Sequence, residues 1–330
     1  MGIIGMKSVL RTDPAGHFPE CFTTTARPYL RFLPQAVDPY FCAIYETIRR
    51  LPQAPGAHAL IAQLLRFGVT FVGLVVYEGT RQSSSRLNPA ESHLLVAQAT
   101  SGAAAIPLYF SVIQAQREGE QDFESTPPKP TPQNAWATLI SVTLGYALPC
   151  WYASQISWRG NALLLVLPYP IYILAMRILL RSSLAPLLKD ASYKIPVLIQ
   201  AGLSFTVSTI GQLKLLGSHI PIHEILRPRV GVDFTGDLHA MLLADLAVTA
   251  TALASHVVLH SYSNRSVFTK AMLLVSMAAG SLVVGPGGAI SVVWAYAELS
   301  NMNKADTDTS KSKAKHSEQQ PLLQAQTRSS

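Results

Sequence analysis

The sequence predicts an all-α membrane protein, a polytopic bundle with about seven transmembrane helices. Only 14% of its 330 residues are charged and its mean hydropathy is +0.25, whereas soluble domains carry about 25% charged residues. Apolar runs long enough to cross the hydrocarbon core, which takes about 20 residues, recur along the chain. These observations favour a lipid environment over the two soluble domains that the length alone would permit.

The order of the segments divides the chain into three parts. Residues 1–58 are expected outside the bilayer, with a short amphipathic helix over residues 38–52 in the interface. Residues 59–298 form the predicted transmembrane domain. Residues 299–330 are polar and rich in Ser, Lys and Gln, which is typical of a disordered tail.

The transmembrane domain holds seven apolar segments separated by polar or Pro-rich stretches. The expected spans are residues 59–77, 93–114, 135–153, 161–180, 195–216, 238–260 and 271–298. In the last span, the Gly-Pro-Gly-Gly run from Gly285 to Gly288 should break or kink the helix. The backbone groups that such a break frees need polar neighbours or a polar cavity.

The formal net charge of +7 comes largely from Lys and Arg residues that sit singly at the ends of apolar runs. This pattern suits contact with lipid headgroups. It argues against a nucleic-acid partner, which would require basic stripes with interleaved aromatic residues. The pattern therefore favours a multi-pass membrane protein, for which we expect the endoplasmic reticulum as the location. The three cysteines show no metal-ligand spacing.

Asp245 lies about a third of the way into the span 238–260, and Thr249 and His256 follow it at helical spacing. A carboxyl group at that depth costs a few kcal/mol unless it is paired, solvated or protonated. A desolvated carboxyl holds its proton more readily and can then act as a general acid. The alternative is a carboxyl that is hydrogen-bonded to a neighbouring helix and only packs the bundle.

The first span ends in a second polar group, because Glu78 and Arg81 are three residues apart and share a face of a continuing helix. They indicate either a functional pair or an interfacial ion pair that closes the helix. The second span carries a stripe of small and polar residues that favours either a site or close helix packing. Its members are Gln98, Ser101, Gly102, Ala105 and Tyr109.

Taken together, these motifs resemble a known family. The matching pieces are Glu78-Gly79-Thr80-Arg81, Gln98 through Gly102, Pro107-Leu108-Tyr109-Phe110, the Leu-Ala-Asp-Leu segment around Asp245, and Gly285-Pro286-Gly287. In this order, over about residues 38–298, the chain resembles the small integral-membrane terpene cyclases of fungal meroterpenoid and indole-terpenoid pathways. It departs from the pattern in the three serines after Arg81 and in a modest aromatic content of 8%.

The resemblance implies a non-redox enzyme of secondary metabolism, of the isomerase or lyase type, that needs no cofactor. Its substrate would be a prenyl chain on an aromatic or other polar head, and protonation of a terminal epoxide or alkene would start a cation cascade. The matching acids are Glu78 and Asp245, expected to face one cavity. The side chains expected to bind the substrate are Arg81, Gln98, Tyr109, Thr249, His256 and Trp294.

Aromatic rings could stabilise the developing cation through cation–π attraction, or anchor the protein at the membrane interface. The candidates are Tyr109, Tyr146, Trp151, Tyr169 and Trp294. No acidic run of the type that binds a magnesium diphosphate is present, and neither is a zinc-protease motif, so no metal is expected. The alternatives are a seven-helix transporter or receptor-like protein, or a scaffold without activity.

Overall fold

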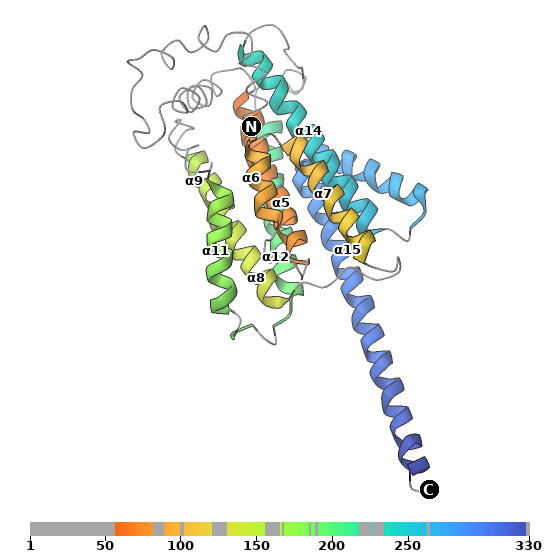
Figure 1. The fold of residues 1–330 in the computed structure, drawn as a ribbon. Helices are drawn as coiled ribbons and strands as arrows, with labels where there is room; N and C mark the ends of the chain where they lie inside the picture. The colour runs from red at the N-terminus through yellow and green to blue at the C-terminus, as the bar shows by residue number, and fades with distance from the viewer. Residues whose placement is uncertain are drawn as a thin grey trace.

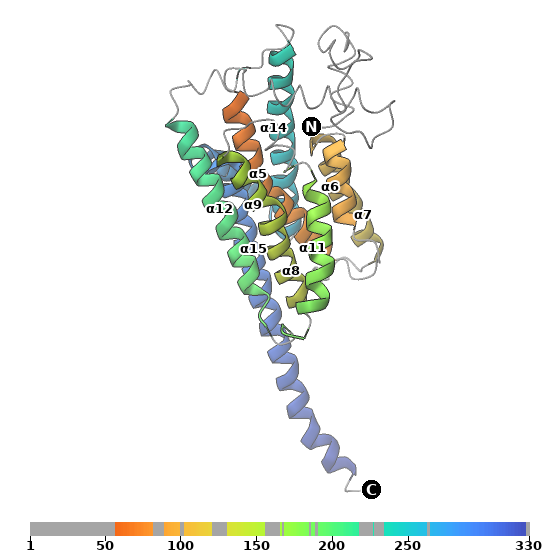
Figure 2. The ribbon, with the colours of Figure 1, turned by 90° about the vertical axis from the view of Figure 1, so that its left-hand side faces the viewer.

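The structure, a computed structural model, describes residues 57–81, 89–99, 102–120, 131–155, 166, 168–184, 186–188, 191–217, 227, 234–262 and 265–327. Within these residues all regular structure is helical, as the sequence predicts. The helices form one elongated bundle, and the last of them projects well beyond it (Figures 1 and 2). The interfacial helix expected over residues 38–52 lies outside the described residues.

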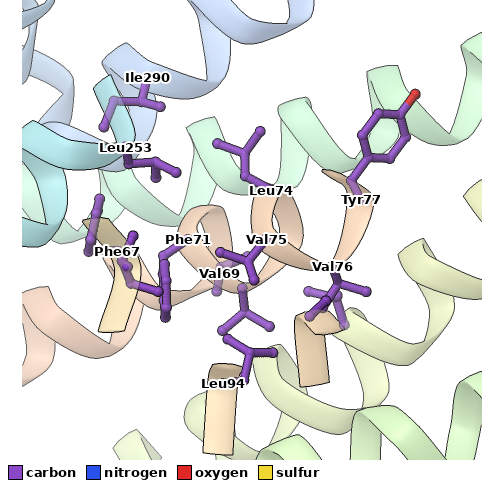
Figure 3. Close-up of a cluster of buried hydrophobic side chains, with 14 of the residues drawn as sticks. Phe67, Val69, Phe71, Leu74, Val75, Val76, Tyr77, Leu94, Leu253 and Ile290 are labelled. Carbon is purple, nitrogen blue, oxygen red and sulfur yellow. The ribbon is translucent and has the colours of Figure 1, made fainter. Parts of the chain in front are cut away.

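Helix α5 (Ala57–Arg81) occupies the centre of the bundle, with α12, α15, α8 and α14 among its neighbours. Most of its side chains are buried, polar ones such as Gln63 and Thr70 among them, so other helices cover it on nearly all sides. Around Phe71 and Val75 it packs against Leu94, Leu253 and Ile290, which come from three other helices (Figure 3). The first predicted span is therefore confirmed as a long, apolar helix.

The prediction of one continuous helix over residues 93–114 is wrong. The segment forms two helices, α6 (Pro89–Ala99) and α7 (Gly102–Glu120). The ring centroids of His93 and Tyr109 are 4.9 Å apart, whereas 16 residues of straight helix would separate them by about 24 Å. The chain thus reverses between the two helices, which lie antiparallel. Hydropathy alone does not reveal this reversal.

The third predicted span is confirmed as a run of helix with a wide turn inside it. It comprises α8 (Pro132–Val142), a π-helical turn η3 (Thr143–Ala147) and α9 (Leu148–Gln155). Thr131 caps the start, accepting the backbone N–H of Asn134 at 3.3 Å. Pro149 has no backbone N–H to donate to the preceding turn, and the π-helical turn accommodates this loss.

The next three helices lie within or cover the predicted spans. Helix α11 (Tyr169–Leu184) corresponds to the second half of the span expected over 161–180, and most residues of the first half lie outside the described residues. Helix α12 (Lys194–Leu216) and helix α14 (Phe234–Ser261) contain the spans expected over 195–216 and 238–260.

The last helix, α15 (Val267–Thr327), breaks at Gly285, as predicted. Gly285 has φ 76° and ψ 160°, a conformation that glycine tolerates far better than other residues. An ideal Cβ on Gly280 would lie 3.5 Å from the Cβ of Ala289, although nine residues of straight helix span about 13 Å. The helix therefore bends back sharply, and Figure 1 shows its two limbs.

Polar side chains of two neighbouring helices lie at the break in α15. The Leu282 carbonyl, at the end of the first limb, accepts a hydrogen bond of 2.9 Å from Gln212 Nε2 on α12. The Gln212 Oε1 atom accepts one of 3.1 Å from Gln63 Nε2 on α5. The polar surroundings that the sequence requires for the freed backbone are thus supplied by two neighbouring helices.

The second limb of α15 runs parallel to α5 in a constant register. An ideal Cβ on Gly287 would lie 2.6 Å from Thr70 Oγ1, the rings of Trp294 and Tyr77 are in edge contact, and Glu298 pairs with Arg81. Each pair is separated by 217 residues in the sequence. The central helix and the last helix therefore stay in contact over three turns.

Four of the described helices are long and apolar enough to cross a membrane: Ala59–Arg81, Lys194–Leu216, His239–Leu259 and Val267–Asn301. The length and apolar composition of these helices indicate a membrane protein, and its described part is all-helical. After Asn301 the helix continues to Thr327, where the sequence favours a disordered tail. Residues with good helix propensity, such as Ala, Lys and Gln, are frequent there and permit this continuation.

Candidate functional site

Asp245 lies on the middle part of α14 and faces the beginning of α7. Its Oδ1 accepts the backbone N–H of Ala103 at 2.6 Å, and only 9% of the residue is exposed. This N–H belongs to the first turn of α7, where amide groups have no partner within their own helix. The break between α6 and α7 thus presents a donor to Asp245 that one continuous helix would have used internally.

Thr249 lies one turn further along α14 on the same face. Its Oγ1 is buried and has no hydrogen-bond partner in the described part of the chain. An ideal Cβ on Gly102 would lie 2.8 Å from this Oγ1 and 3.4 Å from Asp245 Oδ1. Only a residue without a side chain lets the start of α7 approach so closely. The predicted stripe of Asp245 and Thr249 on α14 therefore meets a polar helix end.

Two predicted aromatic residues of other helices pack against each other. Tyr169, at the start of α11, is within electrostatic range of Asp245. The ring of Tyr146 packs edge-on against that of Tyr169 with centroids 4.9 Å apart. The Tyr146 hydroxyl donates to the Leu65 carbonyl of α5 at 3.1 Å. These two aromatic candidates thus form one pair, which is anchored on α5.

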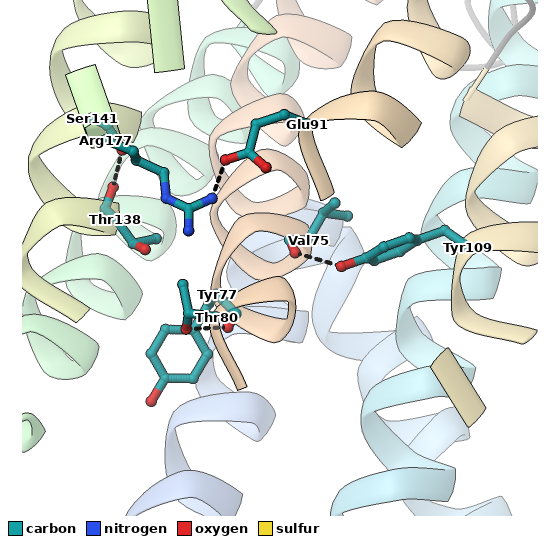
Figure 4. A network of polar contacts seen from close by, with 8 residues as sticks. All are labelled: Val75, Tyr77, Thr80, Glu91, Tyr109, Thr138, Ser141 and Arg177. Carbon is teal, nitrogen blue, oxygen red and sulfur yellow. Dashed lines mark hydrogen bonds and ion pairs between the residues drawn. The ribbon is translucent and has the colours of Figure 1, made fainter. Parts of the chain in front are cut away.

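His256, further along α14, stacks on Phe110 of α7 with ring centroids 3.8 Å apart. Tyr109 is fully buried, and its hydroxyl donates to the Val75 carbonyl of α5 at 2.9 Å (Figure 4). The Tyr109 hydroxyl is thus engaged in holding α7 against α5. His256 shares the Asp245 face of α14 but lies about 16 Å further along the helix.

Glu78 belongs to a separate polar cluster at the end of α5. Its Oε1 lies 3.6 Å from Arg81 Nε, and Arg81 Nη2 forms an ion pair with Glu298 of α15. All three side chains are at most 6% exposed. The Tyr77 and Trp294 rings cover the cluster, with centroids 5.1 Å apart. The expected ion pair thus exists, but it is buried and has a second carboxylate.

The two predicted acids do not lie at the same depth of the bundle. Helices α5 and α7 run in the same direction (Figure 1) and touch at Val75 and Tyr109. Ala103, which contacts Asp245, is six residues before Tyr109, and Glu78 is three residues after Val75. At 1.5 Å per residue the two acids are offset by roughly 13 Å along the bundle. The expectation that one compact cavity brings their carboxyl groups together is therefore corrected.

Two other predicted residues take different positions from those expected. Gln98 lies on α6 and not on α7, because the chain reverses between them, so the stripe of five residues is not continuous. Ser101 lies outside the described residues. Trp151 is 60% exposed on α9, and so it faces the surroundings of the bundle. Its exposure fits the membrane-anchoring alternative.

Three charged residues of the interior went unrecognised in the sequence. Glu298 reads as a boundary charge at the end of an apolar span. Glu91 and Arg177 form a buried ion pair between α6 and α11 (Figure 4). Arg177 lies within the span expected over 161–180, and a charge in such a segment is itself a signal of function.

Among the described residues, no group of three or more His, Cys, Asp or Glu side chains could hold a metal ion. In comparisons with known proteins, no family model matches the chain, and no curated protein or solved structure is significantly similar to it. Any function must therefore be inferred from the arrangement of these side chains.

Proposed function

We propose that the protein is a membrane-bound terpene cyclase in which Asp245 protonates a prenyl chain. The observation that carries the proposal is the single hydrogen bond from Ala103 N–H to Asp245 Oδ1, beside the unpartnered hydroxyl of Thr249. The N-terminal end of α7 holds Oδ1 of the carboxyl group, and the other oxygen is left to carry a proton. An oily isoprenoid would reach this acid from the bilayer.

The position of Asp245 supports this role. The carboxyl group is nearly buried, and no ion pair to it exists within the described residues. A carboxyl group in the middle of an apolar helix without a charged partner is a functional hypothesis by default. We therefore assign the proton-donating role to Asp245.

In the proposed step, the Asp245 O–H transfers its proton to the oxygen of a terminal epoxide. The C–O bond at the more substituted carbon breaks as the electron pair of the neighbouring alkene forms a new C–C bond. Successive alkenes repeat this closure, and the last cation loses a proton to a carboxylate such as that of Glu78, which leaves a product isomeric with the substrate. Asp245 regains a proton from solvent and the final acceptor releases one, so no proton is consumed overall. An alkene could be protonated at carbon in the same way.

The cluster at Glu78 suits a different role from proton donation. Two carboxylates share one guanidinium, so the group is anionic overall when all three are charged. Its charge and the Tyr77 and Trp294 rings would stabilise a cation that develops toward the end of α5. Such ring contacts are worth roughly 0.5–2 kcal/mol each.

The proposal is tested by expressing the protein in a microbial host and supplying farnesyl- and geranylgeranyl-aromatic substrates with and without a terminal epoxide. Asp245→Asn keeps an oxygen that accepts the Ala103 N–H but has no acidic proton, so it should fold and form no cyclic product. Asp237→Asn, two turns earlier on α14, is the matched control and should keep the activity. Cyclic product at the wild-type rate from folded Asp245→Asn would overturn the role.

We also infer that shorter segments complete a multi-pass domain of about seven spans in the endoplasmic reticulum membrane. The run Pro132–Gln155 is as long as the four helices named above, and α7 and α11 add further apolar segments. Helix α6 has only 11 residues and is not counted as a span. Glycosylation sites inserted into each loop would map the topology, and loops between α5 and α12 that all lie on one side would contradict these further spans.

A transporter is the second candidate, and the broken helix α15 is the observation that favours it. Broken helices whose freed backbone meets polar side chains, here Gln212 and Gln63, occur at the substrate sites of transporters. Uptake of a prenylated compound into vesicles without conversion would support transport. Conversion by the purified protein in detergent, where no compartment exists, would exclude transport as the sole function.

A further inference from the structure

A buried ion pair joins the α6–α7 hairpin to α11. Glu91 Oε1 accepts from Arg177 Nη1, and the two residues are 3% and 8% exposed. The pair lies where α6 and α11 pack together, and Figure 4 draws it with Thr138 of α8, whose carbonyl accepts a hydrogen bond from Ser141. Neither charge belongs to the Asp245 site or to the cluster at the end of α5.

The hydrogen bonds of this pair are incomplete. Glu91 Oε2 and Thr138 Oγ1 are buried and have no partner in the described part of the chain. Arg177 carries five N–H donors, and its only hydrogen bond there is the one from Nη1 to Glu91. A buried ion pair repays its desolvation only when the remaining donors and acceptors are also satisfied. The pair therefore leaves one acceptor, Glu91 Oε2, and several N–H donors of Arg177 without a partner in the described part of the chain.

The α6–α7 hairpin gives the distance from this pair to Asp245. His93 of α6 lies opposite Tyr109 of α7, so Glu91 is level with residue 111, which is eight residues after Ala103, the partner of Asp245. The pair is therefore offset from Asp245 by about 12 Å along the bundle. An extended C15 chain is long enough to cover this distance.

We propose that Glu91 and Arg177 bind the oxygenated head group of the prenylated substrate, an inference that rests on the proposed cyclase function. The recognised chemistry is a ring with an enol or phenol hydroxyl near a ring carbonyl. The hydroxyl donates to Glu91 Oε2, and the carbonyl oxygen accepts from the guanidinium of Arg177. The prenyl chain then extends toward Asp245, where its far end is protonated.

Binding is measured on the full-length Asp245→Asn protein, in which conversion does not interfere. The probes are a farnesylated hydroxypyridone, which has both an enol and a ring carbonyl, and its O-methyl ether, which lacks the donor. We expect the hydroxypyridone to bind at least about tenfold more tightly, because a hydrogen bond to a charged group is lost in the ether. Equal binding of the two probes would overturn the inference.

Three further variants in the same background separate recognition from packing. Arg177→Lys keeps the charge but loses the planar fork of donors, and should reduce the affinity for both probes. Glu91→Gln keeps an oxygen for Arg177 but places an NH₂ group where Oε2 stood, and should abolish the preference for the free hydroxyl. Arg181→Lys, an exposed position one turn further on α11, is the matched control and should change nothing.

The outcomes distinguish this inference from the proposed function. A tenfold preference that Glu91→Gln removes supports head-group binding, even if the wild-type protein converts neither probe. A preference that survives Glu91→Gln shows that the pair only packs the helices and overturns the inference. If Arg177→Lys fails to fold, the Glu91→Gln comparison decides, because Gln retains the hydrogen bond to Arg177.

Discussion

Replacement of Gly285 by alanine should destabilise the protein severely, because two separate costs coincide there. The conformation with φ 76° and ψ 160° is nearly exclusive to glycine, and other residues pay about 1–3 kcal/mol to adopt it. The new Cβ would also lie 2.5 Å from Ser208 Oγ and 3.2 Å from the Ser208 carbonyl. Overpacking of this kind adds about 1–3 kcal/mol. The expected loss is about 2–6 kcal/mol.

The assay is equilibrium unfolding of the purified protein in mixed micelles with increasing SDS, followed by tryptophan fluorescence. Gly202→Ala is the matched control, since Gly202 also lies in a membrane helix but has no atom within 4 Å of an added Cβ. That control should gain about 0.5–1 kcal/mol from helix propensity. The two alanine variants should therefore differ in sign.

A double variant separates the two costs. Ser208→Ala removes the closest clashing atom, so Gly285→Ala combined with Ser208→Ala should recover part of the steric cost and retain the backbone cost of about 1–3 kcal/mol. If Gly285→Ala is as stable as the wild type, or resembles Gly202→Ala, then α15 does not break as described. The reasoning about the two limbs would then be refuted.

Three further perturbations test other contacts. Arg81→Met leaves the buried carboxylate of Glu298 without its cation, so the free energy of unfolding should fall by about 3–5 kcal/mol. A loss under 1 kcal/mol in the same SDS titration would contradict the buried pair. Gln212→Leu strips two buried hydrogen bonds and should cost about 2–4 kcal/mol, with an unchanged unfolding midpoint as the contrary result. Spin labels at Ser92 and Ser111 should lie roughly 10–20 Å apart by pulsed electron resonance if α6 and α7 are antiparallel, and roughly 28 Å apart if they form one helix.

Much of the helical layout follows from hydropathy alone, because lipid leaves the backbone few choices. Spans such as Lys194–Leu216 and Phe234–Ser261 agree with their predicted ranges, since a run of apolar residues must satisfy its own hydrogen bonds as helix. The break at Gly285 was also predictable, because a Gly-Pro-Gly-Gly run combines weak helix propensity with a missing donor.

The reversal between α6 and α7 was not predictable in the same way. A hydropathy pattern gives the length of an apolar segment but not its direction, and Gly102 resembles any other small packing residue. The partner of Asp245 depends on this reversal, because the free N–H of Ala103 exists only at a helix start. The candidate acid could thus be found from the sequence, but its hydrogen bond could not.

The buried ion pairs could be predicted only in part. Glu78 and Arg81 are close in sequence, so helical spacing indicates their contact. Glu298 joins them from more than 200 residues away, and Glu91 meets Arg177 across two helices. Contacts of this range depend on how helices rotate about their axes, which side-chain packing decides and a single sequence does not reveal.

The register between α5 and the second limb of α15 has a consequence for how the protein is made. During synthesis, α5 enters the membrane first among the described helices, while the segment that pairs with Thr70, Tyr77 and Arg81 emerges only after more than 200 further residues. The central helix must therefore wait in the bilayer with polar positions uncovered. Chains that stop before Glu298 would leave that seam open, and we expect cellular quality control to recognise them there.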